Sequence, residues 1–191
     1  WVDDPLARWA FGQDLLDHVV AGGDPAGWVA ARPAAGGLPP GRLGRTLLTG
    51  FVDEVVALHE AAGRPDGASV PVGVDVTLDG AVHGVTRVRL VGAVRHTGGA
   101  VVDVRYATDH ASQAVAAAVA LLAAASAGVA VPGADGSAVP DVAHVVRRAP
   151  SGARDDTPVV RALRLAGDDA DARAAGARAA LGALVDLALR V

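Results

Sequence analysis

At 191 residues the chain is long enough to bury the core of one sizeable domain. Its net charge of −4 argues against a free-standing nucleic-acid-binding protein, because such proteins gain affinity from cations that neutralise phosphates. The absence of cysteine excludes disulfide bonds, thiolate catalysis and cysteine-bound zinc. Methionine is absent as well, so we expect the chain to be a fragment of a larger protein.

The N-terminal third of the chain predicts helices. A helix is expected over residues 5–20 with Asp4 as its N-cap, and its apolar side chains can share one face, namely Leu6, Trp9, Ala10, Leu16 and Val20. A second, short helix is expected around Trp28. The clearest amphipathic helix spans residues 43–62, where apolar residues recur every three or four positions from Leu43 onward.

From residue 70 the spacing of apolar residues changes from helical to alternating, which is typical of β-strands. We expect strands over residues 70–78 and 82–94, joined by a tight turn at Asp79-Gly80, since Asp-Gly between alternating apolar residues is a strong hairpin signal. A third strand is expected over residues 101–106, after a turn near Gly98-Gly99. Together these segments predict a three-stranded antiparallel meander.

The rest of the chain predicts further helices and strands. An alanine-rich helix comes first, then a Gly/Pro loop up to Pro140, two strands and a closing helix; we place them at residues 111–127, 142–148, 159–165 and 168–190. This order predicts an α+β, or mixed α/β, domain whose helices cover the sheet. We assign residues 1–66 to a helical lead-in and residues 67–191 to the α/β core, packed as one structural domain.

Neither a membrane segment nor a secretion signal is predicted. The longest apolar run, from Ala111 to Pro132, is mostly alanine and contains Ser112, Gln113 and Ser126, which favours a buried helix over a membrane span. The chain does not begin with a charged and then apolar leader. We therefore expect a cytoplasmic protein without membrane contact.

Positive charge gathers in the predicted meander. Residues 81–105 carry four arginines and one aspartate, a net charge of +3, and the arginines are Arg87, Arg89, Arg95 and Arg105. The first three are separated by even numbers of residues, so they share one face of a strand. Such a face is either merely solvated or in contact with DNA phosphates or an acidic partner.

One segment before the long helix is unusual. Residues 38–44 read Leu-Pro-Pro-Gly-Arg-Leu-Gly, which by itself is a helix-entry turn. An LPPGxLG segment ahead of such a helix resembles the C-terminal region of the RecC subunit of exodeoxyribonuclease V. The resemblance continues through a valine-rich strand pair at residues 74–85, the alanine-rich helix, a short strand ending in arginine and a closing helix at residues 174–189. It covers nearly the whole chain.

The resemblance implies a core like that of the PD-(D/E)XK nucleases. Active members of that fold hold Mg²⁺ with two carboxylates on neighbouring strands and use a lysine to orient or activate water. In this chain His83 and Thr86 stand where the pattern has carboxylates, Asp103 keeps one carboxylate, and Arg105 replaces the lysine. Because arginine stays protonated it cannot act as a general base. We expect no catalytic residue, no metal site and no cofactor.

The function that the resemblance implies is non-catalytic. It is that of a nuclease-like domain in a RecC-type subunit, which holds or routes DNA during double-strand-break repair by homologous recombination and contacts RecB- and RecD-like helicase-nuclease subunits. The candidates for DNA binding are Arg87, Arg89, Arg95 and Arg105, and we expect the isolated chain to bind DNA weakly. Two alternatives stay open: a divergent metal-dependent nuclease using Asp103 with His83, and a purely structural interaction module.

Overall fold

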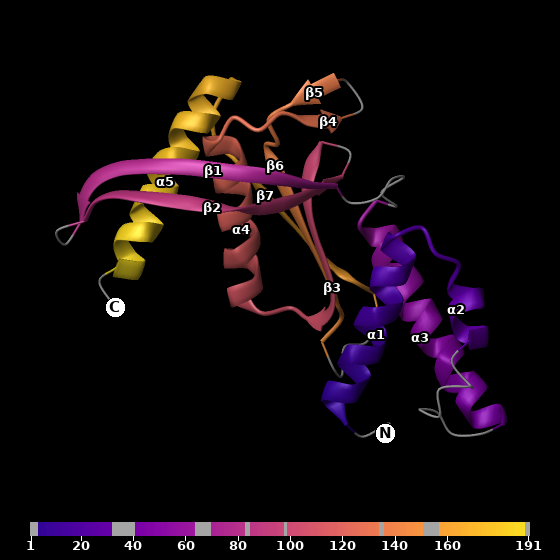
Figure 1. Ribbon diagram of the computed structural model, residues 1–191. Helices are drawn as coiled ribbons and strands as arrows, with labels where there is room; N and C mark the ends of the chain where they lie inside the picture. Colours follow the sequence, from indigo (N-terminus) through magenta and orange to yellow (C-terminus); the bar gives the residue numbers. More distant parts are fainter. Residues whose placement is uncertain are drawn as a thin grey trace. The chain divides into compact units, whose positions relative to one another are not determined.

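The computed structural model describes residues 4–31, 41–63, 70–82, 85–97, 99–133, 136–150 and 157–189. It has a mixed α/β architecture, the class that the sequence predicted, with a five-stranded sheet in the order β1-β2-β3-β6-β7 and a separate pair β4-β5 (Figure 1). The elements in chain order are α1 (Pro5–Val20), α2 (Pro25–Ala31), α3 (Arg42–Ala61), β1 (Val70–Val82), β2 (Val85–Thr97), β3 (Ala100–Thr108), α4 (Ala111–Ser126), β4 (Val131–Gly133), β5 (Gly136–Ala138), β6 (Val142–Arg148), β7 (Val159–Arg164) and α5 (Ala170–Leu189).

The chain divides into two compact units, which we call unit 1 and unit 2. Unit 1 consists of Trp1–Ser69, Val104–His110 and Val146–Arg161, and unit 2 of Val70–Asp103, Ala111–Val145 and Ala162–Val191. Strands β3, β6 and β7 therefore contribute residues to both units. The predicted boundary between residues 66 and 67 lies outside the described residues, and the division into a lead-in and a core stays a prediction.

The start of α1 follows from local chemistry, whereas its buried face does not. The Asp4 carboxylate accepts a hydrogen bond of 2.9 Å from the Leu6 backbone N–H, which makes Asp4 the predicted N-cap. Leu6 and Trp9, two of the apolar residues expected to share a face, are 70% and 44% exposed, so they do not belong to the buried face. The helix instead buries Gly12, Leu15 and Leu16, because it comes closest to its neighbours at the glycine.

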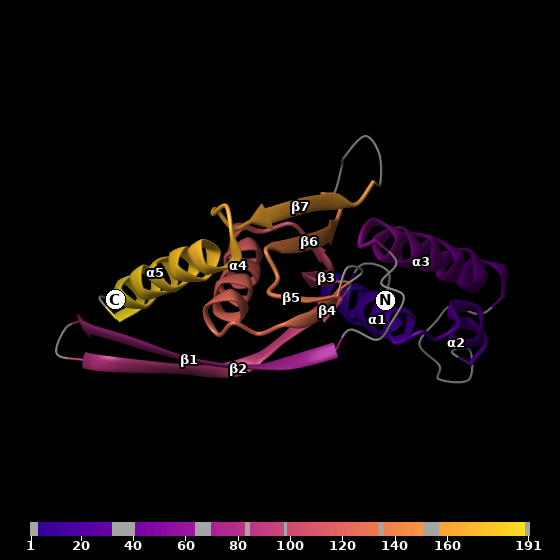
Figure 2. The same ribbon diagram turned by 90° about the horizontal axis from the view of Figure 1, so that it is seen from above.

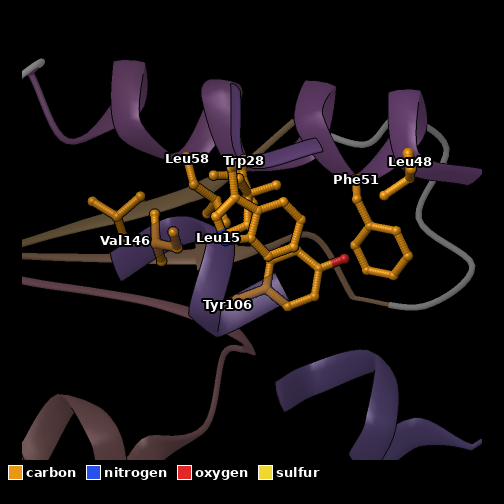
Figure 3. Packing of buried hydrophobic residues seen from close by; sticks show 9 residues of the cluster. Leu15, Trp28, Leu48, Phe51, Leu58, Tyr106 and Val146 are labelled. Carbon is orange, nitrogen blue, oxygen red and sulfur yellow. The ribbon is translucent and has the colours of Figure 1, made fainter. Parts of the chain in front are cut away.

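Aromatic side chains form the centre of unit 1. Phe11 packs edge-on against Trp28 and Phe51, with ring centroids 4.9 Å and 5.1 Å apart, and Phe51 lies 5.8 Å from Tyr106. The rings from α2, α3 and β3 meet aliphatic residues of α1, α3 and β6 in one cluster (Figure 3). Helix α3 contributes through Leu48, Phe51, Val55 and Leu58, as its periodicity predicted, but Leu43 is 62% exposed.

Strands β1 and β2 form a long antiparallel ribbon in unit 2. The prediction of a turn at Asp79-Gly80 is wrong, because β1 continues through these residues to Val82. Asp79 pairs with Arg87 and Val82 with Val85, so two residues of β1 oppose one of β2 between these pairs, as in a β-bulge. Glycine is common at bulges as well as in turns, which explains the wrong assignment.

Strand β3 follows β2 in the sheet but pairs with it over a short length. The two strands are antiparallel, and their register joins His96 to Val101 and Thr97 to Ala100. The helix expected after Asp109 is α4, and β6, β7 and α5 also lie where strands and a closing helix were expected. Strands β4 and β5 occupy a segment predicted as loop, because three-residue strands are too short to give an alternating pattern.

Helices α4 and α5 pack on the same side of the β1–β2 ribbon (Figure 2). The side chains of Val74, Val76 and Leu78 on β1 meet Ala124 of α4 and Leu181 of α5. The Arg178 guanidinium of α5 donates to the carbonyls of Thr77 and Ser126, at 3.0 Å and 3.1 Å, and so ties α5 to β1 and to the end of α4. None of the described helices is long and apolar enough to cross a membrane.

Candidate functional site

The positions predicted to have lost nuclease chemistry lie around two strands. His83 lies outside the described residues, and of Thr86 only the backbone, within β2, is described. Asp103 and Arg105 both lie on β3, two residues apart, with Asp103 half-buried and Arg105 exposed. The structure thus locates the one carboxylate that the pattern retains and the arginine that replaces the lysine.

The surroundings of Asp103 bear on whether it could hold a metal ion. Within the part of the chain that the structure describes, no three His, Asp or Glu residues gather into a group suited to a metal. Mg²⁺ prefers six oxygen ligands in octahedral geometry, and with a single carboxylate it would keep most of its water shell. Among the described residues, Asp103 is therefore not part of such a group.

The hairpin arginines lie on one face, as their spacing predicted. Along β2 the side chains of Arg87, Arg89 and Arg95 are exposed, and those of Val94 and His96 between and beside them are half-buried or buried. The odd-numbered residues of β1 lie on the same outer face, because the register pairs odd residues with odd residues. We call this exposed surface of β1 and β2 the hairpin face.

Aspartates on β1 pair with two of these arginines. The Arg87 Nε donates to Asp79 Oδ1 at 2.7 Å, and Arg89 makes a two-pronged contact with Asp75, through Nε–Oδ1 at 2.9 Å and an Nη2–Oδ2 contact of 2.5 Å. The hydrogen bond from Arg89 lowers the pKa of the Asp75 carboxyl. With three arginines and two aspartates, the hairpin face has a net charge of only +1.

These ion pairs can be predicted from the sequence only with the correct register of β1 and β2, which the wrongly predicted turn did not give. A turn at Asp79-Gly80 removes Asp79 from the strand, and the register that this turn sets does not bring Asp75 beside Arg89. With the observed register, Asp79 lies opposite Arg87, and Asp75 lies diagonally across from Arg89. A net charge counted along the sequence therefore overstated the charge of this surface.

A second polar cluster, in unit 1, was not predicted. The Glu54 carboxylate of α3 accepts hydrogen bonds from the Tyr106 hydroxyl and, at 2.8 Å, from Arg8, and Arg148 lies 3.7 Å from it. The Arg148 guanidinium also stacks over the Tyr106 ring at 4.5 Å. Burial, together with the hydrogen bond to Glu54, raises the pKa of Tyr106 to about 12. The cluster links four separate chain segments, namely α1, α3, β3 and β6, and so has no local sequence signal.

Unit 1 contains a further ion pair beside a buried arginine. Arg161 of β7 donates to the Asp109 carboxylate, with an Nε–Oδ2 distance of 2.8 Å, and this bond lowers the pKa of the Asp109 carboxyl. The positive charge of Arg147 acts in the same direction. Arg147 itself is 0% exposed and donates to the Val146 carbonyl at 2.8 Å. The Asp109 carboxylate thus carries its negative charge close enough to the buried Arg147 guanidinium for the two to attract each other.

These sites differ in what they can do chemically. In the two clusters of unit 1 the side chains of Glu54 and Asp109 are only 29% and 13% exposed, whereas on the hairpin face both partners of each ion pair are more than half exposed. Exposed ion pairs are weak, so an external phosphate or carboxylate can compete for these arginines. Among the described ion pairs, those of the hairpin face are therefore the easiest for an external anion to open.

The whole chain was also compared with known proteins. The family model described as the RecC C-terminal domain matches residues 2–190. A comparison with curated proteins found no match.

Proposed function

We propose, because the chain belongs to the RecC C-terminal domain family, that it acts as a non-catalytic, nuclease-like domain that helps to hold or route DNA and contacts partner subunits. Family membership makes the chain part of a RecC-type subunit, and thereby of the DNA-repair complex exodeoxyribonuclease V. The partners in the proposal are the RecB- and RecD-like subunits of that complex.

The observation that carries the non-catalytic role is the residue set at the nuclease positions. His83 and Thr86 replace two carboxylates, and Arg105 replaces the lysine, while Asp103 alone is retained. Losing one electrostatic contribution commonly lowers a catalytic rate by about a hundredfold to a thousandfold, and here three are missing. The mixed α/β fold with a half-buried Asp103 on β3 supports the same view.

The hairpin face supports the DNA-holding part of the proposal. It exposes Arg87, Arg89 and Arg95 in a row on β2, and the aspartates that pair with two of them do so in solvent, where a phosphate can replace them. Arg105 on β3 is exposed as well and is the fourth candidate. Because the face has a small net charge, we expect DNA binding to be weak. Because its contacts are to phosphates, we expect this binding to be insensitive to DNA sequence and to fall steeply with salt.

The two aspartates also favour a second candidate, a structural module that contacts only protein. Asp75 and Asp79 lower the positive potential of the hairpin face, which a surface built solely for DNA would not need. DNA binding that depends on the hairpin arginines distinguishes the first candidate from this one.

The test compares DNA binding by the purified chain and two sets of charge variants as salt is raised. Replacing Arg87, Arg89 and Arg95 together by glutamine is expected to lower the slope of log affinity against log salt by about 2 to 3, since each phosphate contact contributes nearly one. Replacing Asp75 and Asp79 by asparagine is expected to strengthen binding, because the face then has a net charge of +3 instead of +1.

A matched control removes three exposed or half-buried arginines elsewhere, namely Arg42, Arg164 and Arg173. It makes the same change in net charge, so equal weakening in both triple variants would mean that the hairpin face has no special role. The same samples are incubated with linear DNA and Mg²⁺ or Mn²⁺. Intact DNA is expected, and Asp103→Ala is expected to change nothing; metal-dependent cleavage that disappears in Asp103→Ala would instead support the divergent nuclease.

A further inference from the structure

Strand β2 has one edge without a strand partner over most of its length. One edge pairs with β1 from Val85 to His96, whereas the other pairs with β3 only through His96 and Thr97 among the residues that the structure describes. Strand β4 approaches β2 but pairs with β5. In an antiparallel sheet, alternate residues direct their N–H and C=O groups to each neighbour. About half of the backbone polar groups between Arg87 and Arg95 therefore point to the open edge.

A groove of about 290 Å³ lies beside this strand, between the β1–β2 ribbon and α4. It is lined by Val74 of β1, by residues 90–94 of β2 and, on α4, by the small side chains of Ala116, Val119, Ala120 and Ala123. An apolar cavity of about 150 Å³ already admits a benzene molecule, so the groove has room for roughly two such groups. Its lining is entirely uncharged.

Two of the devices that protect an edge strand are missing from β2. Natural edge strands carry prolines or inward-pointing charges that prevent pairing with another chain. Residues 85–97 contain no proline, and the charged side chains of Arg87, Arg89 and Arg95 point to the outer face. The side chains on the inner face between them, Val88, Leu90 and Val94, are aliphatic.

We propose that an extended segment of a partner protein, with aliphatic side chains at alternate positions, adds to the open edge of β2 as a further strand and inserts aliphatic side chains into the groove. The inference rests on the proposed function, because it assigns a surface to the contact with partner subunits. Main-chain hydrogen bonds supply affinity in this mode of recognition, and pockets for alternate side chains supply specificity.

The charges around the groove decide which segment fits. Helix α4 has no charged residue along its length, and the side chains of Arg87 and Arg89 lie on the opposite, outer face of the ribbon. An acidic segment would thus gain little there and would lose hydration, whereas an uncharged aliphatic one matches both walls. Nine residues, from Arg87 to Arg95, give the edge a length of about 30 Å at roughly 3.3 Å per residue.

Backbone amide exchange in the full-length subunit tests the proposal, before and after assembly with its purified RecB- and RecD-like partners. In the free subunit, alternate amides between residues 87 and 95 are expected to exchange fast. Assembly is expected to slow those same amides at least tenfold, because a hydrogen-bonded strand protects them. Fast exchange that persists in the assembled complex overturns the proposal.

Two groove variants and one control complete the experiment. Ala116→Glu places a charge at an exposed position of the groove, and Ala120→Leu fills the groove while keeping it apolar; each is expected to remove the protection of β2 and weaken assembly at least tenfold. Ala179→Glu introduces the same charge at an exposed position of α5 and is expected to leave both unchanged. If all three variants assemble like the unaltered subunit, the groove is not the contact.

The remaining outcomes separate this inference from the proposed function. Failure of the unaltered subunit to assemble contradicts both. Assembly without protection of β2 contradicts only the strand addition. Protection that appears in the free subunit and grows with its concentration means that a second copy occupies the edge, which also overturns the choice of partner. Weaker assembly of the groove variants without alternating protection means that a helix occupies the groove.

Discussion

Unit 1 and unit 2 are packed with different kinds of side chain. The three Trp, two Phe and one Tyr of the chain all belong to unit 1, whereas unit 2 is built from valine, leucine and alanine. In unit 1 the rings interlock, and the Tyr106 hydroxyl brings a buried polar network with it. In unit 2 two helices lie on a ribbon of β-branched residues, and a groove remains between β2 and α4.

How well each core is filled depends more on where the large side chains lie than on the total hydrophobic content of the chain. The chain is 51% hydrophobic but only 3% aromatic, so large side chains can fill one core and not two. Alanine permits close helix contacts, but it is too small to fill the groove between the β1–β2 ribbon and α4. Unit 1 is therefore the more tightly specified core, and unit 2 retains apolar surface that a partner can use.

The largest effects are expected from removing a buried leucine in each unit. Leu15 and Leu181 are both essentially unexposed, and Leu→Ala in a core lowers the free energy of unfolding by about 2 to 5 kcal/mol. Leu15→Ala is expected in the upper part of that range, because rigid rings around it cannot close the cavity. Leu181→Ala is expected in the lower part, because most of α5 is exposed or half-buried and the helix can settle.

Denaturant unfolding followed by circular dichroism measures both losses on the same scale. Tryptophan fluorescence adds a signal that comes from unit 1 alone, since every Trp belongs to it. A loss for Leu181→Ala equal to or larger than that for Leu15→Ala would contradict the view that unit 1 is the tighter core.

Two glycine substitutions sharpen the same contrast at a smaller scale. A β-carbon at position 12 in α1 would come within 2.1 Å of Cδ1 of Tyr106, whereas one at position 182 in α5 would meet nothing within 4 Å. Gly12→Ala is expected to destabilise the protein by about 1 to 3 kcal/mol through overpacking. Gly182→Ala is expected to stabilise it by about 0.5 to 1 kcal/mol, because alanine is the better helix former.

Thermal or denaturant unfolding of the two variants distinguishes these opposite signs. If Gly12→Ala is neutral or stabilising, the Tyr106 ring is free to move, and the aromatic cluster does not fix the position of α1. Such a result would make the two units more alike than their contacts indicate.

The helices were predictable because their signals are local. Asp4 and the Gly22 stop define α1 within a few residues, and α3 shows its apolar period without reference to the rest of the chain. The strands were also predictable from local sequence. The register of β1 against β2 was not, because Gly80 suits a bulge as well as a turn. The exposed face of α1 depended on Gly12, whose role appears only once Tyr106 lies against it.

The sequence was enough to predict which arginines share a face at the candidate site, but not the net charge of that face. The even spacing of Arg87, Arg89 and Arg95 was enough to place them on one face. Their pairing with Asp75 and Asp79 required the register of β1 against β2, which a single misplaced turn changes. The Glu54–Tyr106 hydrogen bond joins residues that are 52 positions apart, and no pattern in one sequence connects them.

A further effect is expected from the buried tyrosine and appears only in alkaline solution. Tyr106 is 1% exposed, and its pKa is raised from 10.0 to about 12, first by burial and then by the hydrogen bond to Glu54, against the opposing charge of Arg148. Between pH 10 and 12 the unfolded chain therefore releases the phenolic proton while the folded chain keeps it. By linkage, the stability that this group contributes is fully present below pH 10 and is lost as the pH rises towards 12.

The loss amounts to at most about 2 kcal/mol, taking 1.36 kcal/mol for each pKa unit and allowing for solvent screening. Tyr106→Phe removes the titrating group, so the free energy of unfolding of this variant is expected to change less with pH over this range than that of the unaltered chain. The variant also loses the hydrogen bond to Glu54, which makes it less stable by about 1 kcal/mol near pH 8. Denaturant unfolding at a series of pH values measures the difference, and tyrosinate absorbance follows Tyr106 directly, because the chain has one tyrosine. Parallel curves of the free energy of unfolding against pH, from pH 8 to 12, would mean that the Tyr106 hydroxyl ionises as easily in the fold as in the unfolded chain. Unit 1 would then not be distinguished from unit 2 by a buried polar network.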